Sequence, residues 1–299
     1  MPARVTGAYV ASVLVIFIYA GNLLVGKAIN DLPPFTIAFF RLLIGFLVLF
    51  PLTYRSAWEH RATFAAHPRQ LLVLTLTGVA LFNTFIYSAL HFTSPTNAAV
   101  LETGIPAITV ALSAWLLHER LRALQWVGVA FSLAGSLWVV LNGQLLQLTR
   151  MEWNVGDAIM VGAVLTWAVY SVAARQFLPL FPGRAVLLIM TGASVLLLFP
   201  VAVLEWWLVG FPPLDSAAHW AGLAFLGIFP SVIALLLYNH AIGVIGPSRA
   251  SIFMNLLPVV TMVGAFLLLG DRITWWQISG AAIVIVGVLA TTRRPRAVT

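Results

Sequence analysis

The sequence predicts an all-α integral membrane protein with ten transmembrane helices in two inverted five-helix repeats. Three observations support this fold class. First, the 299 residues are 61% hydrophobic and 8% charged, whereas soluble proteins carry about 25% charged residues. Second, the apolar residues form continuous runs of the length, about 20 residues, that a membrane-spanning helix needs. Third, part of the sequence recurs 152 positions later. This composition excludes a soluble enzyme.

Ten apolar runs are predicted to span the membrane, and the loops between them are too short for a separate soluble domain. The runs lack the alternating pattern of a membrane β-barrel. The first run has no small-residue cleavage site, which favours a retained helix over a signal peptide. The longest predicted loop, residues 55–69, is interpreted as a solvated connector. The predicted spans are residues 5–27, 33–54, 70–91, 96–117, 122–142, 155–177, 183–205, 217–241, 247–269 and 273–292.

The basic residues predict that both termini lie in the cytoplasm. Twelve arginines fall on the side of the amino terminus, against Lys27, Arg150 and Arg272 on the other side. Cytoplasmic loops carry the excess of Lys and Arg, and an even number of spans puts both termini on one side. The net charge of +7 therefore indicates orientation in the cytoplasmic (inner) membrane, and no nucleic-acid partner is expected.

The internal repeat predicts two halves, residues 1–146 and 147–299. Because each half has five spans, an odd number, the second half must enter the membrane upside down. Inverted repeats of this kind are the architecture of alternating-access transporters. A looser shift of 148 matches Tyr19 with Trp167 and Lys27 with Arg175. The pairs at a shift of 152 are Pro95 with Pro247, Ala98 with Ala250, Pro106 with Pro258, Glu119-Arg120 with Asp271-Arg272, Gln125 with Gln277, Gly128 with Gly280, and Gly135 with Gly287.

Several motifs carry a family resemblance. They are Tyr19-Ala-Gly-Asn22, Leu32-Pro33-Pro34, Phe40-Arg41, Trp115-Leu-Leu-His-Glu119-Arg120 and Leu267-Leu-Leu-Gly-Asp271-Arg272. With these motifs, essentially the whole chain resembles the drug/metabolite transporter superfamily, specifically the EamA-type exporters. The resemblance implies a central site lined by spans one to four and six to nine and braced by spans five and ten. It also implies export of amino acids or other small metabolites, with the aromatic amino acid exporters as the first branch to compare.

Ionisable residues inside spans are costly and usually face a cavity or a partner. Glu102 is predicted to bind substrate, by holding an ammonium group or carrying a proton, and its repeat partner is the neutral Met254. The alternative is a protonated carboxyl that bonds a neighbouring helix. Arg41 is predicted to be a structural cation, with binding of a substrate carboxylate as the alternative. Lys27 and Arg175, at span ends, are predicted to be gate or interface anchors.

Aromatic and amide side chains inside spans predict an organic substrate. Tyr19 with Asn22, and Trp167 with Tyr170, are three residues apart and so share a helix face. Two such faces suit an amphipathic molecule better than an inorganic ion, although helix packing alone could also account for them. Pro106 and Pro258 each leave a carbonyl one turn earlier without its donor, which predicts a hinge or a shaped helix. The remaining predicted substrate-binding residues are Asn83, Tyr87, Tyr238 and Asn255.

The predicted function is secondary-active export of small organic metabolites, amino acids first, by alternating access. Exporters of drugs or of nucleoside or sugar derivatives are the alternative, and an intramembrane enzyme or a channel is the rival class. A catalytic role is disfavoured because His118-Glu119-Arg120 does not continue to the second His of a metalloprotease motif. No cofactor or metal is expected, and the absence of Cys excludes disulfides, Cys-ligated zinc, iron–sulfur clusters and thiol nucleophiles. The predicted partners are a small-molecule substrate and the lipid bilayer, with coupling to protons or another ion left open, and the predicted assembly is a monomer or weak dimer.

Overall fold

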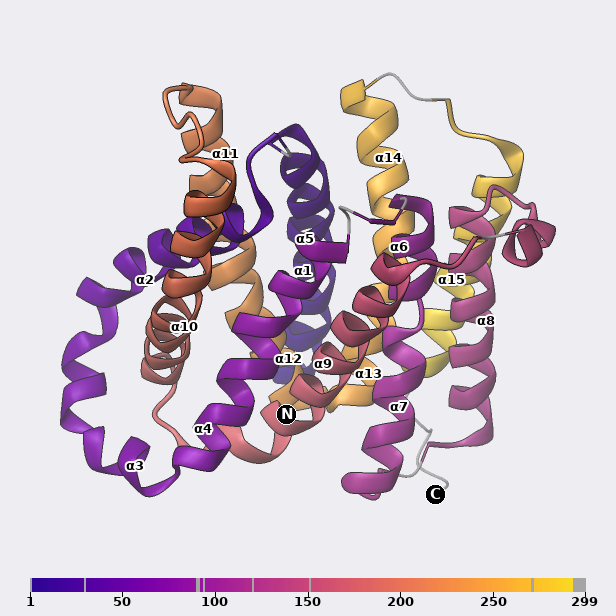
Figure 1. The fold of residues 1–299 in the computed structure, drawn as a ribbon. Helices are drawn as coiled ribbons and strands as arrows, with labels where there is room; N and C mark the ends of the chain where they lie inside the picture. Colours follow the sequence, from indigo (N-terminus) through magenta and orange to yellow (C-terminus); the bar gives the residue numbers. More distant parts are fainter. Residues whose placement is uncertain are drawn as a thin grey trace.

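A computed structural model describes residues 2–29, 31–89, 92–93, 95–119, 121–150, 152–269 and 272–292 (Figure 1). Within these residues all regular secondary structure is helical. By length and composition, nine helices of the described part are apolar enough to cross a membrane, and Trp275–Thr291 is a shorter apolar helix. The chain is therefore an all-helical, multi-pass membrane protein.

Six predicted spans are continuous α-helices whose ends lie near the predicted ones. Single charged residues and prolines inside the runs do not interrupt the helices, as Arg41 and Pro51 in α2 and Pro200 in α10 show. Two short 3₁₀ turns, η2 (Leu145–Arg150) and η3 (Leu178–Leu180), lie in the connections. The six helices are α1 (Pro2–Ala28), α2 (Pro34–Glu59), α8 (Ala123–Val140), α9 (Val155–Phe177), α10 (Ala185–Val209) and α15 (Trp275–Thr292).

The other four predicted spans are irregular, and at matching places in the two halves of the sequence. The third and eighth each contain a π-helical segment, and the fourth and ninth each change geometry one turn before a proline. The segments of the first half are α4 (Pro68–Thr75), the π-helix η1 (Leu76–Ala80), α5 (Leu81–Ala89), α6 (Pro95–Glu102) and α7 (Ile105–Leu116). Those of the second are α11 (Ala217–Ile228), the π-helix η4 (Phe229–Ala234), α12 (Leu235–Ile245), α13 (Pro247–Ile252), the 3₁₀ turn η5 (Phe253–Leu256) and α14 (Leu257–Leu269).

Each of the two prolines lies in the first turn of an α-helical segment. Pro106 lies in the first turn of α7, after α6 has ended at Glu102. Pro258 likewise lies in the first turn of α14, after η5. The first turn tolerates proline because the N–H groups there have no partner within the helix. In the fourth span Thr103 and Gly104 separate α6 from α7, whereas in the ninth span α13, η5 and α14 follow one another without a gap.

The connector predicted at residues 55–69 is mostly helical. α2 continues to Glu59, and the short helix α3 (Arg61–Ala66) follows directly. No Gly or Pro occurs between Pro51 and Pro68, so nothing in this stretch disfavours a helix. Charge alone predicted a loop here, and charge marks the membrane boundary without ending the helix.

α8 and α15 pack closely along their length and lie side by side in Figure 1. The repeat glycines make this contact. A Cβ atom on Gly135 would lie 2.9 Å from the carbonyl oxygen of Gly280, and one on Gly128 would lie 2.7 Å from that of Gly287. Because the earlier glycine of α8 meets the later glycine of α15, the two helices run antiparallel. Small residues let helix backbones approach closely in a membrane.

We expect Gly135→Ala to destabilise this crossing. The new methyl group would lie 2.7 Å from the backbone nitrogen of Val284, and such overpacking costs about 1–3 kcal/mol. Thermal unfolding in detergent measures the effect, with Gly7→Ala as the control because nothing lies within 4 Å of a Cβ there. Equal midpoints for the two variants would contradict the packing described here.

A carboxylate of α10 caps the first turn of α2. Glu205 accepts hydrogen bonds from the backbone N–H groups of Phe35 at 3.1 Å and Thr36 at 2.8 Å, and from the Thr36 hydroxyl at 2.8 Å. The first N–H groups of a helix lack partners within the helix and carry partial positive charge. This explains how a carboxyl is accommodated near the end of a span.

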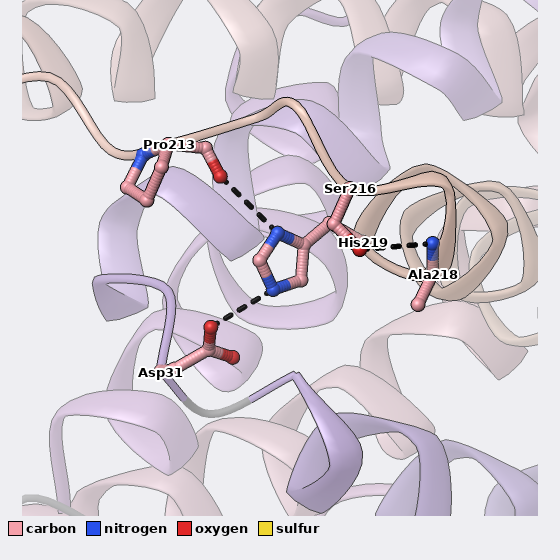
Figure 2. A network of polar contacts seen from close by, with 5 residues as sticks. All are labelled: Asp31, Pro213, Ser216, Ala218 and His219. Atoms are coloured by element: carbon pink, nitrogen blue, oxygen red, sulfur yellow. Dashed lines mark hydrogen bonds and ion pairs between the residues drawn. The ribbon is translucent and has the colours of Figure 1, made fainter.

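An ion pair joins the loop after α1 to the first turn of α11. Figure 2 shows the His219 ring between two acceptors, with Nε2 2.8 Å from the Asp31 carboxylate and Nδ1 3.2 Å from the carbonyl oxygen of Pro213. Ser216 caps the same helix by accepting from the backbone N–H of Ala218 at 3.2 Å. Asp31 is exposed, and exposed ion pairs contribute only about 0–1 kcal/mol. The pair positions a loop more than it stabilises the fold.

Candidate functional site

A cavity of about 620 Å³ lies between helices of the two halves of the chain. Its lining comes from α1, α2, α5, α6, α7, α8, α9, α12, α14 and the start of α15, and from the short segments η1, η4 and η5. This size suits a small organic molecule. The residues singled out from the sequence that line it are Tyr19, Asn22, Arg41, Asn83, Glu102, Trp167 and Pro258.

Arg41 is the buried cation of this cavity, only 2% exposed. Its Nε donates to the Ser231 hydroxyl at 3.0 Å. Its Nη1 donates to the Tyr87 hydroxyl at 2.5 Å and to Asn22 Oδ1 at 3.3 Å. All these partners are neutral, and no ion pair to Arg41 exists among the described residues. The guanidinium is thus held in place with its charge uncompensated, which suits it to bind an anion.

Glu102 is the acid that lines the same cavity. It ends α6, at the break before α7, where the chain turns through Thr103 and Gly104. No hydrogen bond or ion pair to its carboxyl occurs within the described part of the chain, so the bond to a neighbouring helix, which was the alternative to substrate binding, is not found there. A carboxyl that faces a cavity without a protein partner can accept from a cation or exchange a proton.

The wall of the cavity beside these charges is aromatic. Tyr19 and Trp167, the residues paired by the looser repeat, meet edge to face with ring centroids 6.0 Å apart. Phe82 packs on Trp167 with centroids 4.4 Å apart, and all three rings line the cavity. Such a wall favours the apolar part of an amphipathic ligand.

Four predicted substrate-binding residues do not line the cavity. Tyr87 accepts a hydrogen bond from Arg41 and would therefore affect a ligand only through that side chain. Tyr170 donates to Asn239 Oδ1 at 2.7 Å, and the Tyr238 hydroxyl lies 2.9 Å from that of Ser171. Asn255, in η5, donates from Nδ2 to the Ser132 hydroxyl at 2.9 Å. The sequence placed them on inward-facing helix sides, but buried side chains on those sides can bond each other as well as a ligand.

The predicted gating residues fall in different places. Arg175, near the end of α9, donates from Nη1 to the carbonyl oxygens of Gly243 and Ile242, the latter at 3.3 Å. It therefore ties α9 to the end of α12, away from the cavity lining. Pro258 lines the cavity, whereas Pro106 does not. The side chain of Lys27 lies outside the described residues.

The structure adds residues that the sequence did not single out. Ser231 positions Arg41 from the π-helix η4. Because η4 inserts an extra residue into the turn, a regular helical projection misplaces this hydroxyl. Thr261 and Ala265, on α14, also line the cavity. The one sequence signal that could have found them is the internal repeat, which matches this part of α14 with α7. Among the described residues, no three His, Asp or Glu side chains come together as metal ligands would.

Comparison with known proteins identifies relatives along the full chain. The EamA-like transporter family matches twice, over residues 6–141 and 154–293. The uncharacterized transporter YyaM of Bacillus subtilis is 31% identical over 225 residues, which cover 74% of this chain and 72% of the relative. A Salmonella typhimurium protein named "Probable amino-acid metabolite efflux pump" is 25% identical over 293 residues, covering 93% and 92% of the two chains. A crystal structure at 21% identity shares the fold, with a TM-score of 0.76 and coverage of 95% and 97%.

Proposed function

We propose that this chain, which belongs to the EamA-like transporter family, is a secondary-active exporter of amino acids with apolar, including aromatic, side chains. One observation carries the proposal: the buried Arg41 and the partly buried Glu102 line a single cavity, and neither is paired with an opposite charge within the described residues. The exposed Arg272 is the third charged residue of the lining. A zwitterion supplies the missing partners of Arg41 and Glu102. The efflux of amino-acid metabolites named for the Salmonella relative supports the same substrate class.

Each group of an amino acid has a counterpart in this cavity. The carboxylate suits the guanidinium of Arg41, which can form charge-assisted hydrogen bonds. The ammonium group suits the carboxylate of Glu102. The side chain would rest against Tyr19, Phe82 and Trp167. A neutral sugar or a drug without a carboxylate would leave Arg41 uncompensated, so the alternative substrate classes fit less well.

The proposed mechanism is alternating access between two inverted repeats with ten spans. The two family matches and the helix irregularities at matching places support the two halves. The antiparallel crossing of α8 and α15 supports inversion, because equivalent helices of inverted repeats run in opposite directions. Contacts also recur in exchanged form: α5 packs on α9 as α12 packs on α1. Both termini would then be cytoplasmic, and the chain would lie in the inner membrane.

We propose that Glu102 couples export to proton entry. A carboxyl cannot hold a proton and pair with an ammonium group at the same time, so proton and substrate compete for it. Because the competing species occupy the carrier in turn, an inward proton gradient would drive outward movement of the amino acid. No ATP-binding segment is required for this coupling.

An export panel tests the proposed function. Cells that overproduce the protein are loaded with labelled aromatic and aliphatic amino acids, and efflux is compared with cells that lack it. We expect faster efflux of the aromatic and large apolar amino acids. If no amino acid moves while a drug or a nucleoside or sugar derivative does, the proposed substrate class is wrong.

A further inference from the structure

We propose that Arg272 and Gln277 form a second anion subsite at the outer mouth of the cavity, separate from Arg41. This subsite takes the carboxylate of an amino acid after it leaves Arg41 and before it escapes into water. The inference rests on the proposed function for the identity of the anion. It is carried by two unpartnered donors at one end of the cavity and by a difference between the two halves of the repeat.

The first observation is a cation without a partner. Arg272 lies shortly before α15, where it is exposed and lines the cavity. No hydrogen bond or ion pair to its guanidinium group occurs among the described residues. Glu102, the acid of the same lining, lies on the other side of the cavity entrance in sequence, at the end of α6. The guanidinium group is therefore free to bind an anion in the mouth.

The second observation is an amide donor that helix capping does not use. The Oε1 atom of Gln277 accepts from the backbone N–H of Thr274 at 3.0 Å. This bond requires the amide oxygen there, so it fixes the NH₂ group at the other end. The repeat partner Gln125 caps α8 in the same way, from the backbone N–H of Arg122 at 3.0 Å, and its Nε2 donates to the carbonyl oxygen of Thr291 at 3.2 Å. Gln277 lines the cavity, and its Nε2 has no partner within the described part of the chain.

Neighbouring contacts hold this donor in place. The Thr274 hydroxyl donates to Asn142 Oδ1, just beyond α8. The ring of Trp276 packs against Gly143, where a Cβ atom would lie 2.8 Å from it. These contacts fix the first turn of α15 against the corner that follows α8. The side chain of Gln277 is thus presented to the cavity by a rigid turn, which lowers the cost of ordering it around a ligand.

The subsite is separate from the central cation. Arg41 is seven residues into α2 and Thr261 is eight before the end of α14, which places both about 10–12 Å below the outer ends of their helices. Arg272 lies beyond that end of α14, at the end of the molecule opposite the C terminus (Figure 1). The α14 wall between these levels carries the apolar Met262 and Ala265. Because a charge is costly to move along an apolar wall, a second cation at the mouth favours passage of a carboxylate.

Protection of a single thiol measures occupancy of the mouth, because the chain contains no cysteine of its own. Ile273→Cys places the thiol in the lining beside Arg272. The full chain, in right-side-out vesicles, reacts with a membrane-impermeant thiol reagent in the presence of phenylalanine, of 3-phenylpropionate, which has only the carboxylate, or of phenylethylamine, which has only the amine. We expect the two carboxylates to slow labelling and the amine to have no effect, since reaction needs an accessible thiolate.

Three variants in this background assign the protection to the subsite. Arg272→Gln should raise the half-protecting concentration of 3-phenylpropionate about tenfold or more, and Gln277→Leu should raise it less. Arg41→Gln should leave this protection in place, because the mouth binds the carboxylate independently. The matched control is Arg150→Gln, an exposed arginine of η2 that is predicted on the same side of the membrane and does not line the cavity. It should leave the protection unchanged.

The outcomes separate this inference from the proposed function. Equal protection in Arg272→Gln and Arg150→Gln, equal protection by the amine, or loss of protection in Arg41→Gln overturns the inference, even if amino acids are exported. Protection that depends on Arg272 in a protein that exports no amino acid upholds the anion subsite and counts against the proposed substrate. Ala265→Cys, on the same wall, is the reporter if Ile273→Cys folds poorly or fails to label, and a reporter thiol that no carboxylate protects also overturns the inference.

Discussion

Arg41→Gln is expected to abolish selection of the substrate carboxylate. Hydrogen bonds to charged groups contribute about 1.5–3 kcal/mol, so apparent affinity for an amino acid should fall about 10–100-fold. An amine that lacks the carboxylate should be affected far less. Uptake into inside-out vesicles, with an aromatic amino acid compared with its decarboxylated amine, measures both. In the variant, the ratio of amino acid uptake to amine uptake should approach one.

The matched control for this prediction is Arg175→Gln. Arg175 also bonds polar groups of a neighbouring helix, but its partners are backbone carbonyl oxygens away from the cavity lining. The control variant should keep the preference for the carboxylate even if its rate changes. Thermal unfolding of both variants in detergent checks that they are folded. An unaltered preference in Arg41→Gln would show that the cation does not contact substrate.

Glu102→Gln is expected to uncouple transport from the pH gradient. Glutamine keeps the shape of the side chain but can neither release a proton nor carry the charge that attracts an ammonium group. Uphill transport driven by an imposed pH gradient in proteoliposomes should disappear. Exchange of amino acid down its own gradient should persist with apparent affinity reduced about 10–100-fold. Undiminished pH-driven flux would rule out proton coupling through Glu102.

Glu205→Gln provides the corresponding control. Glu205 is also a buried carboxyl, but it caps α2 and does not line the cavity. Loss of its charge should lower the thermal midpoint, because the first turn of α2 loses part of its capping, while the response to a pH gradient remains. Comparing the two variants separates a general effect of removing a buried carboxyl from a specific effect in the cavity.

Membership of the family and the approximate positions of the helices were predictable from local features of the sequence. The apolar run 155–177 coincides with α9, because the length of a spanning helix is set by bilayer thickness. The π-helices η1 and η4 were not predictable, since an inserted residue leaves the run apolar throughout. The break after Glu102 was missed for a related reason: proline suits both a kink and a first turn.

The site was predictable only in part. Tyr19, Asn22, Asn83, Glu102 and Trp167 do line one cavity. Tyr170 and Tyr238 satisfied the same rules of depth and spacing, yet each bonds a polar neighbour. Arg41, predicted to be a structural cation, bonds three neutral side chains brought from α1, α5 and η4, and it also lines the cavity.

The sequence by itself therefore determined that the chain is a helical membrane protein, to which family it belongs, and which few polar residues enter its spans. These properties depend on composition and on periodicity along one chain. Only the tertiary structure decided which polar groups satisfy one another and which face a common cavity. That division depends on distances between helices far apart in sequence, as between Asn22, Arg41 and Ser231. No local pattern contains those distances.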